Sequence, residues 1–250
     1  MSLPRRDFLQ RCSLASTLLI LPRGLRAGAA TSPNSRLQIA LVGAGGRGRT
    51  ALAALQSEQI VAFCDVDFAR GRDAIQKDGK SRGLLERFSG ARWFHDYREM
   101  FEQMGDAIDA VAIAVPDHMH FPIALAALRR RKHVFVEKPL CRSVSEVRAL
   151  HAAARTAGVV TQMGNQGRAS EGIRLTREWV RAGVIGRVHT VHAWTHRKGR
   201  SYSYPLEELN APSPPPPATL QYDLWLGATP HRPYHALRGH GSWRSWCQWY

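Results

Sequence analysis

Three glycines that follow a short apolar run constrain the fold of this chain more than any other feature. Residues 37–42 form the run, and the loop after it reads Gly43, Ala44, Gly45, Gly46, Arg47, Gly48. In this spacing Gly43 permits a tight turn, Gly45 lets the backbone approach a pyrophosphate, and Gly48 lets a new helix pack closely on the strand. The N–H groups at the start of that helix point outward and can bind phosphate. The pattern is typical of a dinucleotide site.

An acidic residue stands where the second strand of such a unit should end. Residues 59–64 form a second strand-like run, and Asp65 follows them, 17 residues after Gly48. From this position a carboxylate can reach the hydroxyl groups of the adenosine ribose. Its charge would repel a 2′-phosphate, so we expect NAD as the cofactor in preference to NADP. An alternative is that Asp65 only caps the helix that follows, and the two roles are compatible.

Strands and helices alternate from residue 37 to about residue 163. The strand-like runs are continuously apolar and rich in β-branched residues, which indicates parallel strands buried on both faces. A further strand at 159–163 completes the set. We therefore predict an α/β fold with a doubly wound parallel sheet, a Rossmann domain over residues 36–163. The expected helices cover 48–57, 67–80, 97–104, 122–131 and 144–157, and Ser143 with Glu146 forms a capping box at the start of the last one.

The pattern changes after Gly164. We expect a helix at 170–182, a strand at 187–197 and a stiff proline-rich excursion at 210–218. Tryptophans at 225, 243, 246 and 249 need more partners than one strand and one loop supply. The spacing of the last three favours a buried face over stacking on sugar rings. We therefore expect residues 164–250 to be the start of a second domain that is incomplete at Tyr250.

The positive charge of the chain does not point to nucleic acid. The formal net charge is +15, but the arginines are scattered and no nucleic-acid motif is present. The one dense run, 129–132, closes a predicted helix, where cations complement the helix dipole. The 11 histidines give no metal-ligand pattern: His192 and His196 would lie about 13 Å apart on a strand, and we expect no metal.

The N-terminus is typical of an export signal. Residues 4–9 resemble a twin-arginine motif, the 11 residues 12–22 are largely apolar, and small residues follow at 27–30. An apolar stretch of this length is too short to span a bilayer of about 30 Å, so we expect no stable membrane anchor. Residues 1–30 are predicted to direct folded protein to the periplasm. The alternative is a basic amphipathic helix retained in a cytoplasmic protein.

Two more loops leave the carboxyl ends of predicted strands, where doubly wound sheets bind ligands. They are residues 115–120 and residues 136–139, which contain Glu137 and Lys138. Beside a cationic nicotinamide the ammonium form of a lysine would be disfavoured, and Lys138 could then take up or hold a hydroxyl proton. The alternative is a surface lysine paired with Glu137.

These motifs together identify a family resemblance. The glycine loop, the Pro116 to His120 loop, Glu137-Lys138-Pro139 and residues 162–167 resemble the glucose-fructose oxidoreductase, inositol dehydrogenase and MocA-like (Gfo/Idh/MocA) family, from about residue 36 to at least residue 227. The resemblance implies a second, α+β domain with a mainly antiparallel open sheet, which would offer a surface for homo-oligomers of the full-length protein. It also implies that substrate lies between the domains, and Asp223 to Gly227 resembles a loop of the exported, sugar-directed branch.

The same resemblance implies roles for particular residues. Lys138 is expected to position the substrate hydroxyl, and His120 is the other catalytic candidate. Glu137, Pro116 and His118 are expected to border the nicotinamide, and Asn165 to lie near the cofactor or substrate. In the family a further acid and histidine, or a tyrosine, comes from the second domain, and that general base would lie beyond Tyr250.

The expected function is an NAD-dependent oxidoreductase that transfers hydride between a sugar or polyol carbinol and a tightly bound nicotinamide. One alternative is a redox-neutral glycosidase, in which transient oxidation of a sugar carbon permits elimination. The other is a non-catalytic nucleotide-binding or sugar-binding relative that lacks the second-domain base. The sequence does not specify the sugar or the oxidised carbon.

Overall fold

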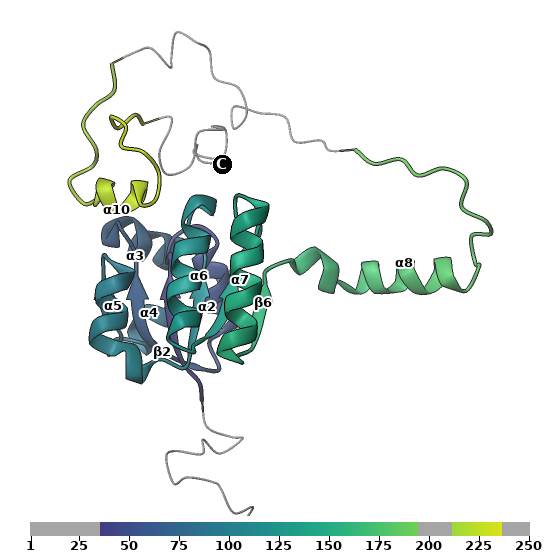
Figure 1. Ribbon diagram of the computed structural model, residues 1–250, viewed down its shortest axis with the longest axis horizontal. Coiled ribbons are helices and arrows are strands. Elements are labelled where there is room, and N and C mark those ends of the chain that lie inside the picture. The colour runs from purple at the N-terminus through teal and green to yellow at the C-terminus, as the bar shows by residue number, and fades with distance from the viewer. Residues whose placement is uncertain (1–35, 195–211, 237–250) are drawn as a thin grey trace, which may run out of the picture. The chain divides into compact units, whose positions relative to one another are not determined.

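A six-stranded parallel sheet is the centre of the computed structural model, which describes residues 36–194 and 212–236 (Figure 1). The strands lie in the order β3-β2-β1-β4-β5-β6, and each neighbouring pair is parallel. The strand order reverses between β1 and β4, so a ligand crevice is expected outside the carboxyl ends of these two strands. The six strands are β1 (Gln38–Val42), β2 (Gln59–Cys64), β3 (Arg92–Phe94), β4 (Ala110–Ile113), β5 (His133–Val136) and β6 (Thr161–Met163).

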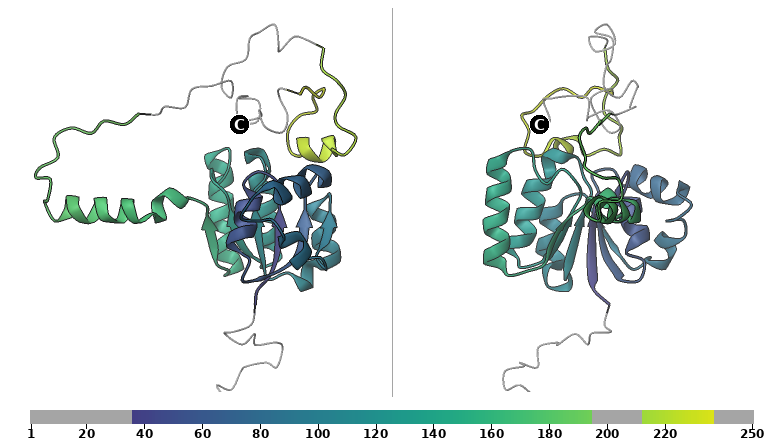
Figure 2. Two further views of the ribbon diagram at one scale, coloured as in Figure 1. Left: turned by 180° about the vertical axis from the view of Figure 1, so that it is seen from behind. Right: turned by 90° about the vertical axis from the view of Figure 1, so that its right-hand side faces the viewer.

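Helices cover both faces of this sheet, as the edge-on view in Figure 2 shows. One layer packs on the core cluster that contains Leu52, Ile75 and Leu84, and its helices are α2 (Gly48–Ala54), α3 (Phe68–Lys77) and α4 (Leu84–Arg87). The other layer packs on the cluster that contains Met100, Ile123 and Leu150, and its helices are α5 (Tyr97–Met104), α6 (His120–Arg129) and α7 (Val144–Ala157). Short 3-10 turns lie at η1 (Gly105–Ala107) and η2 (Asp117–Met119).

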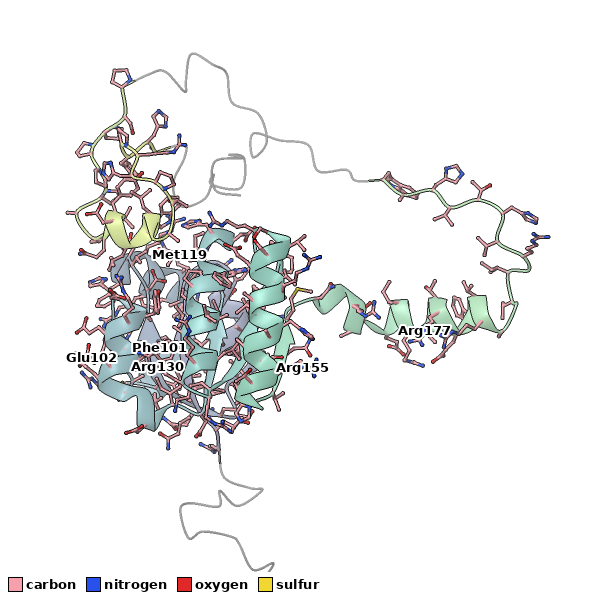
Figure 3. The ribbon with its side chains drawn as sticks, viewed as in Figure 1. Phe101, Glu102, Met119, Arg130, Arg155 and Arg177 are labelled. Carbon is pink, nitrogen blue, oxygen red and sulfur yellow. The ribbon has the colours of Figure 1, made fainter. Side chains whose placement is uncertain are left out.

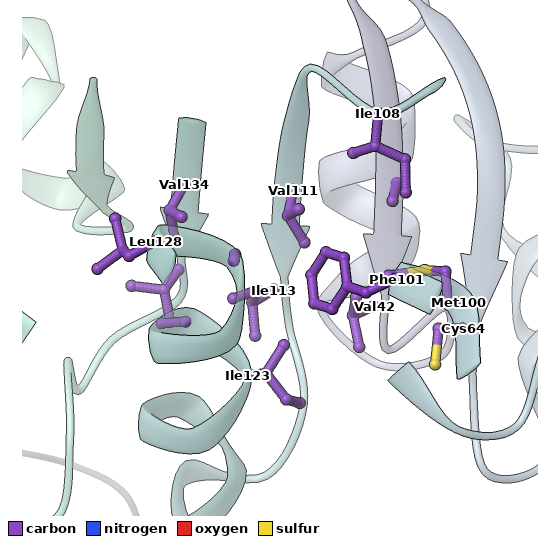
Figure 4. Packing of buried hydrophobic residues seen from close by; sticks show 14 of the residues in the cluster. Val42, Cys64, Met100, Phe101, Ile108, Val111, Ile113, Ile123, Leu128 and Val134 are labelled. Atoms are coloured by element: carbon purple, nitrogen blue, oxygen red, sulfur yellow. The ribbon is translucent and has the colours of Figure 1, made fainter. Parts of the chain in front are cut away.

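Successive residues of the inner strands β1, β2 and β4 are buried on opposite faces of the sheet. Val42, Val111 and Ile113 belong to the cluster under α5, α6 and α7 (Figure 4), whereas Leu41 and Phe63 belong to the cluster under α2, α3 and α4. Because side chains alternate along a strand, a strand covered on both sides must be apolar at every position. This confirms the prediction that the apolar runs are doubly buried parallel strands.

Local signals place several helix ends as the sequence predicted. Ser143 and Glu146 form the capping box of α7, and Gly158 ends that helix with φ of 64°. The side chain of Asp67 accepts a hydrogen bond from the Arg70 N–H and caps α3. On α5 and α6, the guanidinium of Arg130 lies 5.1 Å from the centre of the Phe101 ring, a pair labelled in Figure 3. The caps stabilise the ends of α3 and α7, and the Arg130–Phe101 contact joins the end of α6 to α5.

The edge strand β3 was missed from sequence because its three residues, Arg92 to Phe94, are too short for a periodic signal. It pairs with β2 at the edge of the sheet, and Trp93 on β3 stacks on Phe63 of β2 with ring centres 4.7 Å apart. Strand pairing and this aromatic contact, and not local propensity, therefore define the element.

Beyond the sheet, the structure describes η3 (Gln166–Ala169), α8 (Glu171–Arg181) and α10 (Tyr222–Leu226). The predicted helix at 170–182 is confirmed. The predicted strand at 187–197 is wrong over residues 187–194, which form no strand. A strand needs a partner for its N–H and C=O groups, and no described segment beyond the Rossmann sheet supplies one.

Three predicted features lie outside the described residues: the signal at 1–30, the end of that strand at 195–197, and the tryptophans at 243, 246 and 249. Among the helices that are described, none has the length and apolarity required to cross a bilayer.

Candidate active site

The glycine loop between β1 and α2 has the geometry that its sequence predicted. Gly43 adopts φ of +85°, and a Cβ there would lie 2.6 Å from the Ala114 carbonyl oxygen at the end of β4. A Cβ on Gly48 would overlap the carbonyl oxygen of Gly43. Only glycine permits this combination of a left-handed turn and close approach. The turn therefore brings the start of α2 directly against the end of β1.

Gly45 and Gly46 instead face open space, since a Cβ on either would meet no atom within 4 Å. Both line a cavity of about 640 Å³ at the carboxyl ends of the strands. The same cavity is lined by Asp65 from the end of β2 and by Glu137 and Lys138 from the end of β5. A pyrophosphate can approach the backbone of a loop closely only where no side chain stands between them, and two glycines that border a cavity provide this. The residues present fit a bound dinucleotide.

Asp65 is tied to the glycine loop. Its Oδ2 accepts hydrogen bonds from the N–H groups of Ala44 at 2.8 Å and Gly45 at 3.3 Å, and its Oδ1 accepts from the Asp67 N–H at 3.0 Å. Burial raises the pKa of the Asp65 carboxyl, and these three hydrogen bonds oppose the rise. The alternative that Asp65 caps α3 is not supported, because Asp67 fills that position. Contact of Asp65 with a ribose stays a prediction.

Glu137 pairs with Arg47 and not with the neighbouring lysine. Arg47 Nη2 lies 3.4 Å from Glu137 Oε1, and the Glu137 side chain is 9% exposed. The other oxygen, Oε2, accepts from the Lys138 backbone N–H at 3.3 Å. Within residues 36–194 and 212–236, no carboxylate lies within ion-pair distance of Lys138 Nζ, and Lys138 is an exposed residue that lines the cavity. The alternative of a lysine paired with Glu137 is therefore not what the structure shows.

His120 lines the cavity, and its expected catalytic role stays a prediction. Its ring is fully buried. Nδ1 lies 2.6 Å from the Pro139 carbonyl oxygen, and Nε2 lies 3.0 Å from the Val115 carbonyl oxygen. Both ring nitrogens thus face backbone carbonyl groups, which can only accept hydrogen bonds. The geometry favours a positioning role, in which His120 links the loop after β4 to the loop after β5.

His118 is also fully buried, and it contacts a segment far away in the sequence. Its Nε2 lies 2.8 Å from the backbone carbonyl oxygen of Trp225 in α10. Burial lowers the pKa of His118 to about 4, so the ring is neutral at pH 7. Since the carbonyl can only accept, the single ring proton lies on Nε2 and is donated to it.

The cavity brings together most of the predicted site residues. Gly48 and His118 do not line the cavity, but each contacts a residue that does: Gly43 and Trp225, respectively. Asn165 is also absent from the lining and is an exposed residue at the start of η3, because β6 ends at the sheet edge, away from the strand-order reversal. The lining residues missed by sequence reasoning include Arg49, Thr50, Val66, Arg70, Gly71, His95, Asp96, Tyr97, Arg98, Ile123 and Ala228. Those numbered 95–98 follow the unrecognised strand β3, so no sequence signal placed them at the site.

A metal centre finds no support in this part of the chain. Among the described residues, no group of three or more His, Cys, Asp or Glu side chains is arranged to hold a metal ion. The site is thus defined by a glycine loop, an acid at the end of β2 and a lysine after β5. These features are those of an α/β dinucleotide-binding protein.

Comparison with known families agrees with this class. Residues 37–165 match the model described as "Oxidoreductase family, NAD-binding Rossmann fold", and residues 172–250 match "Oxidoreductase family, C-terminal alpha/beta domain". The first match alone covers more than half of the chain. The chain belongs to the Gfo/Idh/MocA oxidoreductase family, whose Rossmann fold binds NAD.

Individual relatives match over parts of their length. A glycosyl hydrolase family 109 protein of Solibacter usitatus is 32% identical over 155 residues, which cover 57% of this chain and 34% of that protein. A levoglucosan dehydrogenase of Pseudarthrobacter phenanthrenivorans is 35% identical over 81 residues, which cover 32% of this chain and 21% of that protein. A solved oxidoreductase from Pseudomonas syringae has a TM-score of 0.50 and 29% identity, covering 61% of this chain and 43% of its own. The matches with the two curated relatives span about a third of their length or less.

Proposed function

We propose that the protein is an NAD-dependent oxidoreductase that acts on a carbinol group of a sugar or polyol. The observation that carries the proposal is that the glycine loop and Lys138 line the same cavity. The name of the levoglucosan dehydrogenase relative supports a carbohydrate substrate. A bound nicotinamide would supply the acceptor or donor of hydride.

Lys138 has the placement needed to act on the substrate hydroxyl. Glu137 is engaged by Arg47 Nη2 and by the Lys138 N–H, so the Lys138 ammonium is left to the cavity. An ammonium that donates a hydrogen bond to a carbinol oxygen stabilises the negative charge that develops as the hydroxyl proton leaves. Lys138 would therefore orient the hydroxyl and lower its pKa, so that a separate base can take the proton.

His120 and the Arg47–Glu137 pair would hold this lysine in place. His120 contacts the Pro139 carbonyl oxygen, directly after Lys138. The Arg47–Glu137 pair joins the glycine loop to the residue directly before Lys138. The loop that carries Lys138 is thus held on both sides, and its position relative to the dinucleotide loop is fixed.

To test the proposal, the protein is incubated with NAD and each member of a panel of sugars and polyols, and the formation of NADH is measured by its absorbance. Lys138→Met should lower kcat by about a hundredfold, the range typical of lost acid–base assistance, with NADH affinity unchanged. Lys132→Met, a lysine outside the cavity, is the matched control. Activity of Lys138→Met equal to that of the control would contradict the role of Lys138.

A redox-neutral reaction is a second candidate, favoured by the name of the glycosyl hydrolase family 109 relative. In that reaction a glycoside is cleaved with no net change in nicotinamide oxidation. Release of an aglycone from a chromogenic glycoside, together with constant absorbance of NADH, would select it over net sugar oxidation. Net accumulation of NADH with an unglycosylated polyol would select the oxidoreductase.

We further propose that the protein is exported through the twin-arginine route to the periplasm with its cofactor already bound. Support comes from residues 4–9 and the apolar residues after them. Fusion of residues 1–35 to a reporter that folds in the cytoplasm should move the reporter to the periplasm. Replacement of both Arg5 and Arg6 by lysine should retain it inside the cell, and equal export of the two fusions would contradict this route.

A further inference from the structure

A segment from beyond the Rossmann sheet contacts the rim of the dinucleotide cavity at two separate places. This segment, residues 220–229, contains α10 and is called the Trp225 segment below. At one end, the Gln221 N–H donates to the Val66 carbonyl oxygen at 2.9 Å. Leu220, Trp225 and Leu226 form a small buried cluster with Val66 packed against it. Val66 directly follows Asp65, so this contact lies at the end of β2.

The other contact is with the loop after β4. His118 Nε2–H donates to the Trp225 carbonyl oxygen at 2.8 Å, and the two rings meet edge to face with centres 5.4 Å apart. Gly227 lies against Met119, labelled in Figure 3, so closely that a Cβ on Gly227 would collide with the Met119 sulfur. Neither His118 nor Met119 belongs to the glycine loop, so these contacts attach the Trp225 segment to a different part of the site.

The two contacts lie on either side of the glycine loop. In the sheet, β2 and β4 are the two neighbours of β1, and the loop follows β1. A segment joined to the ends of both neighbours must therefore pass across the carboxyl end of β1. In agreement, Asp223, Leu224, Trp225, Gly227 and Ala228 line the same cavity as Gly45 and Asp65.

We propose that the Trp225 segment is a wall of the dinucleotide site that slows release of the bound nicotinamide dinucleotide, and that His118 and Met119 are positioning residues that hold it there. The proposal rests on the dinucleotide site, not on the sugar or polyol substrate. It assigns a positioning role to two residues of the loop after β4. It also gives a structural basis for a cofactor that remains bound through export.

The dissociation rate of NADH from the full chain tests the proposal. NADH-loaded protein is mixed with excess NAD, and the loss of protein-sensitised NADH fluorescence is followed by stopped flow. His118→Leu removes the N–H that donates to the Trp225 carbonyl, so release should become about tenfold faster. His118→Gln retains an N–H donor, and its release rate should lie closer to that of the parent.

Trp225→Ala should also accelerate release by about tenfold or more, because it removes both the ring and its packing. Trp179→Ala is the matched control, since Trp179 is 53% exposed and does not line the cavity. Thermal melting of each variant establishes that it is folded. Release rates of His118→Leu and Trp225→Ala within twofold of the control would overturn the proposal.

Hydrogen exchange on the parent protein needs no substitution and gives an independent readout. NADH should slow amide exchange across residues 222–229 as well as in the glycine loop. Protection of the glycine loop alone would overturn the proposal and leave the dinucleotide site intact. Failure of the parent to bind NADH would refute the dinucleotide site and the wall together, whereas bound NADH with no sugar turnover would refute only the proposed substrate.

Discussion

The buried neutral histidine at position 118 predicts a specific dependence of stability on pH. Burial is the main cause of its low pKa, and the hydrogen bond to Trp225 opposes the shift. Protonation of His118 in the folded protein would place a charge in an apolar environment. The unfolded chain meets no such cost, so acid should favour unfolding through this residue.

The sign and size of the change in the free energy of unfolding follow from the pKa of His118 in the folded and unfolded protein. The pKa of His118 is about 4 in the folded protein against 6.5 for the unperturbed side chain, so the unfolded chain binds more protons between pH 6.5 and pH 4. Stability therefore falls as the pH is lowered through this window and is unaffected by His118 above it. With about 1.4 kcal/mol per pKa unit, the loss is about 2 kcal/mol between pH 7 and pH 5, and about 3 kcal/mol by pH 4.

Urea unfolding of His118→Gln and of the parent at pH 7 and pH 5 measures this loss. Glutamine keeps a donor at the position but does not titrate. The parent should lose about 2 kcal/mol more than His118→Gln over the interval. His151→Gln, a change at an exposed histidine of α7, should behave as the parent does. An equal loss for the parent and His118→Gln would refute the burial of a neutral ring at this site.

Two further predictions follow from the cofactor loop. Gly43→Ala should lower the free energy of unfolding by about 2 kcal/mol, because the new Cβ approaches the Ala114 carbonyl oxygen and the positive φ is strained; urea unfolding checks this, and a stability equal to the parent's would contradict it. Asp65→Ala should raise the affinity for NADPH relative to NADH by about tenfold, since the carboxylate that repels a 2′-phosphate is removed. Fluorescence titration with both nucleotides measures the ratio, and an unchanged ratio would argue against a ribose role for Asp65.

The sequence predicted the Rossmann domain well because its signals are local. The apolar strands, the glycine loop and the Ser143–Glu146 capping box each depend on residues close together in the chain. The strand Arg92–Phe94 escaped prediction because pairing with β2 defines it. The strand expected at 187–197 failed over its described part for the same reason, since a single strand without a partner is not stable.

The sequence predicted the residues of the candidate site only where a charged side chain directly follows a predicted strand. Lys138 and Asp65 follow strands that end at the same edge of the sheet, so their presence in one cavity follows from topology. The pairing of Glu137 with Arg47 and the contact of His118 with Trp225 join residues 90 and 107 positions apart in the sequence. No periodicity links such positions, and the same holds for the contacts of His120 with the carbonyl oxygens of Val115 and Pro139.

The central claim is that the glycine loop holds a nicotinamide dinucleotide, and NADH titration of the parent, Gly45→Val and Gly90→Val tests it most directly. A Cβ on Gly45 or on Gly90 meets no atom within 4 Å, so both variants should fold, but only Gly45 lines the cavity. We expect saturable binding at one NADH per chain for the parent and Gly90→Val, and loss of binding for Gly45→Val. Equal NADH affinity in all three proteins, or no binding to the parent, would contradict it.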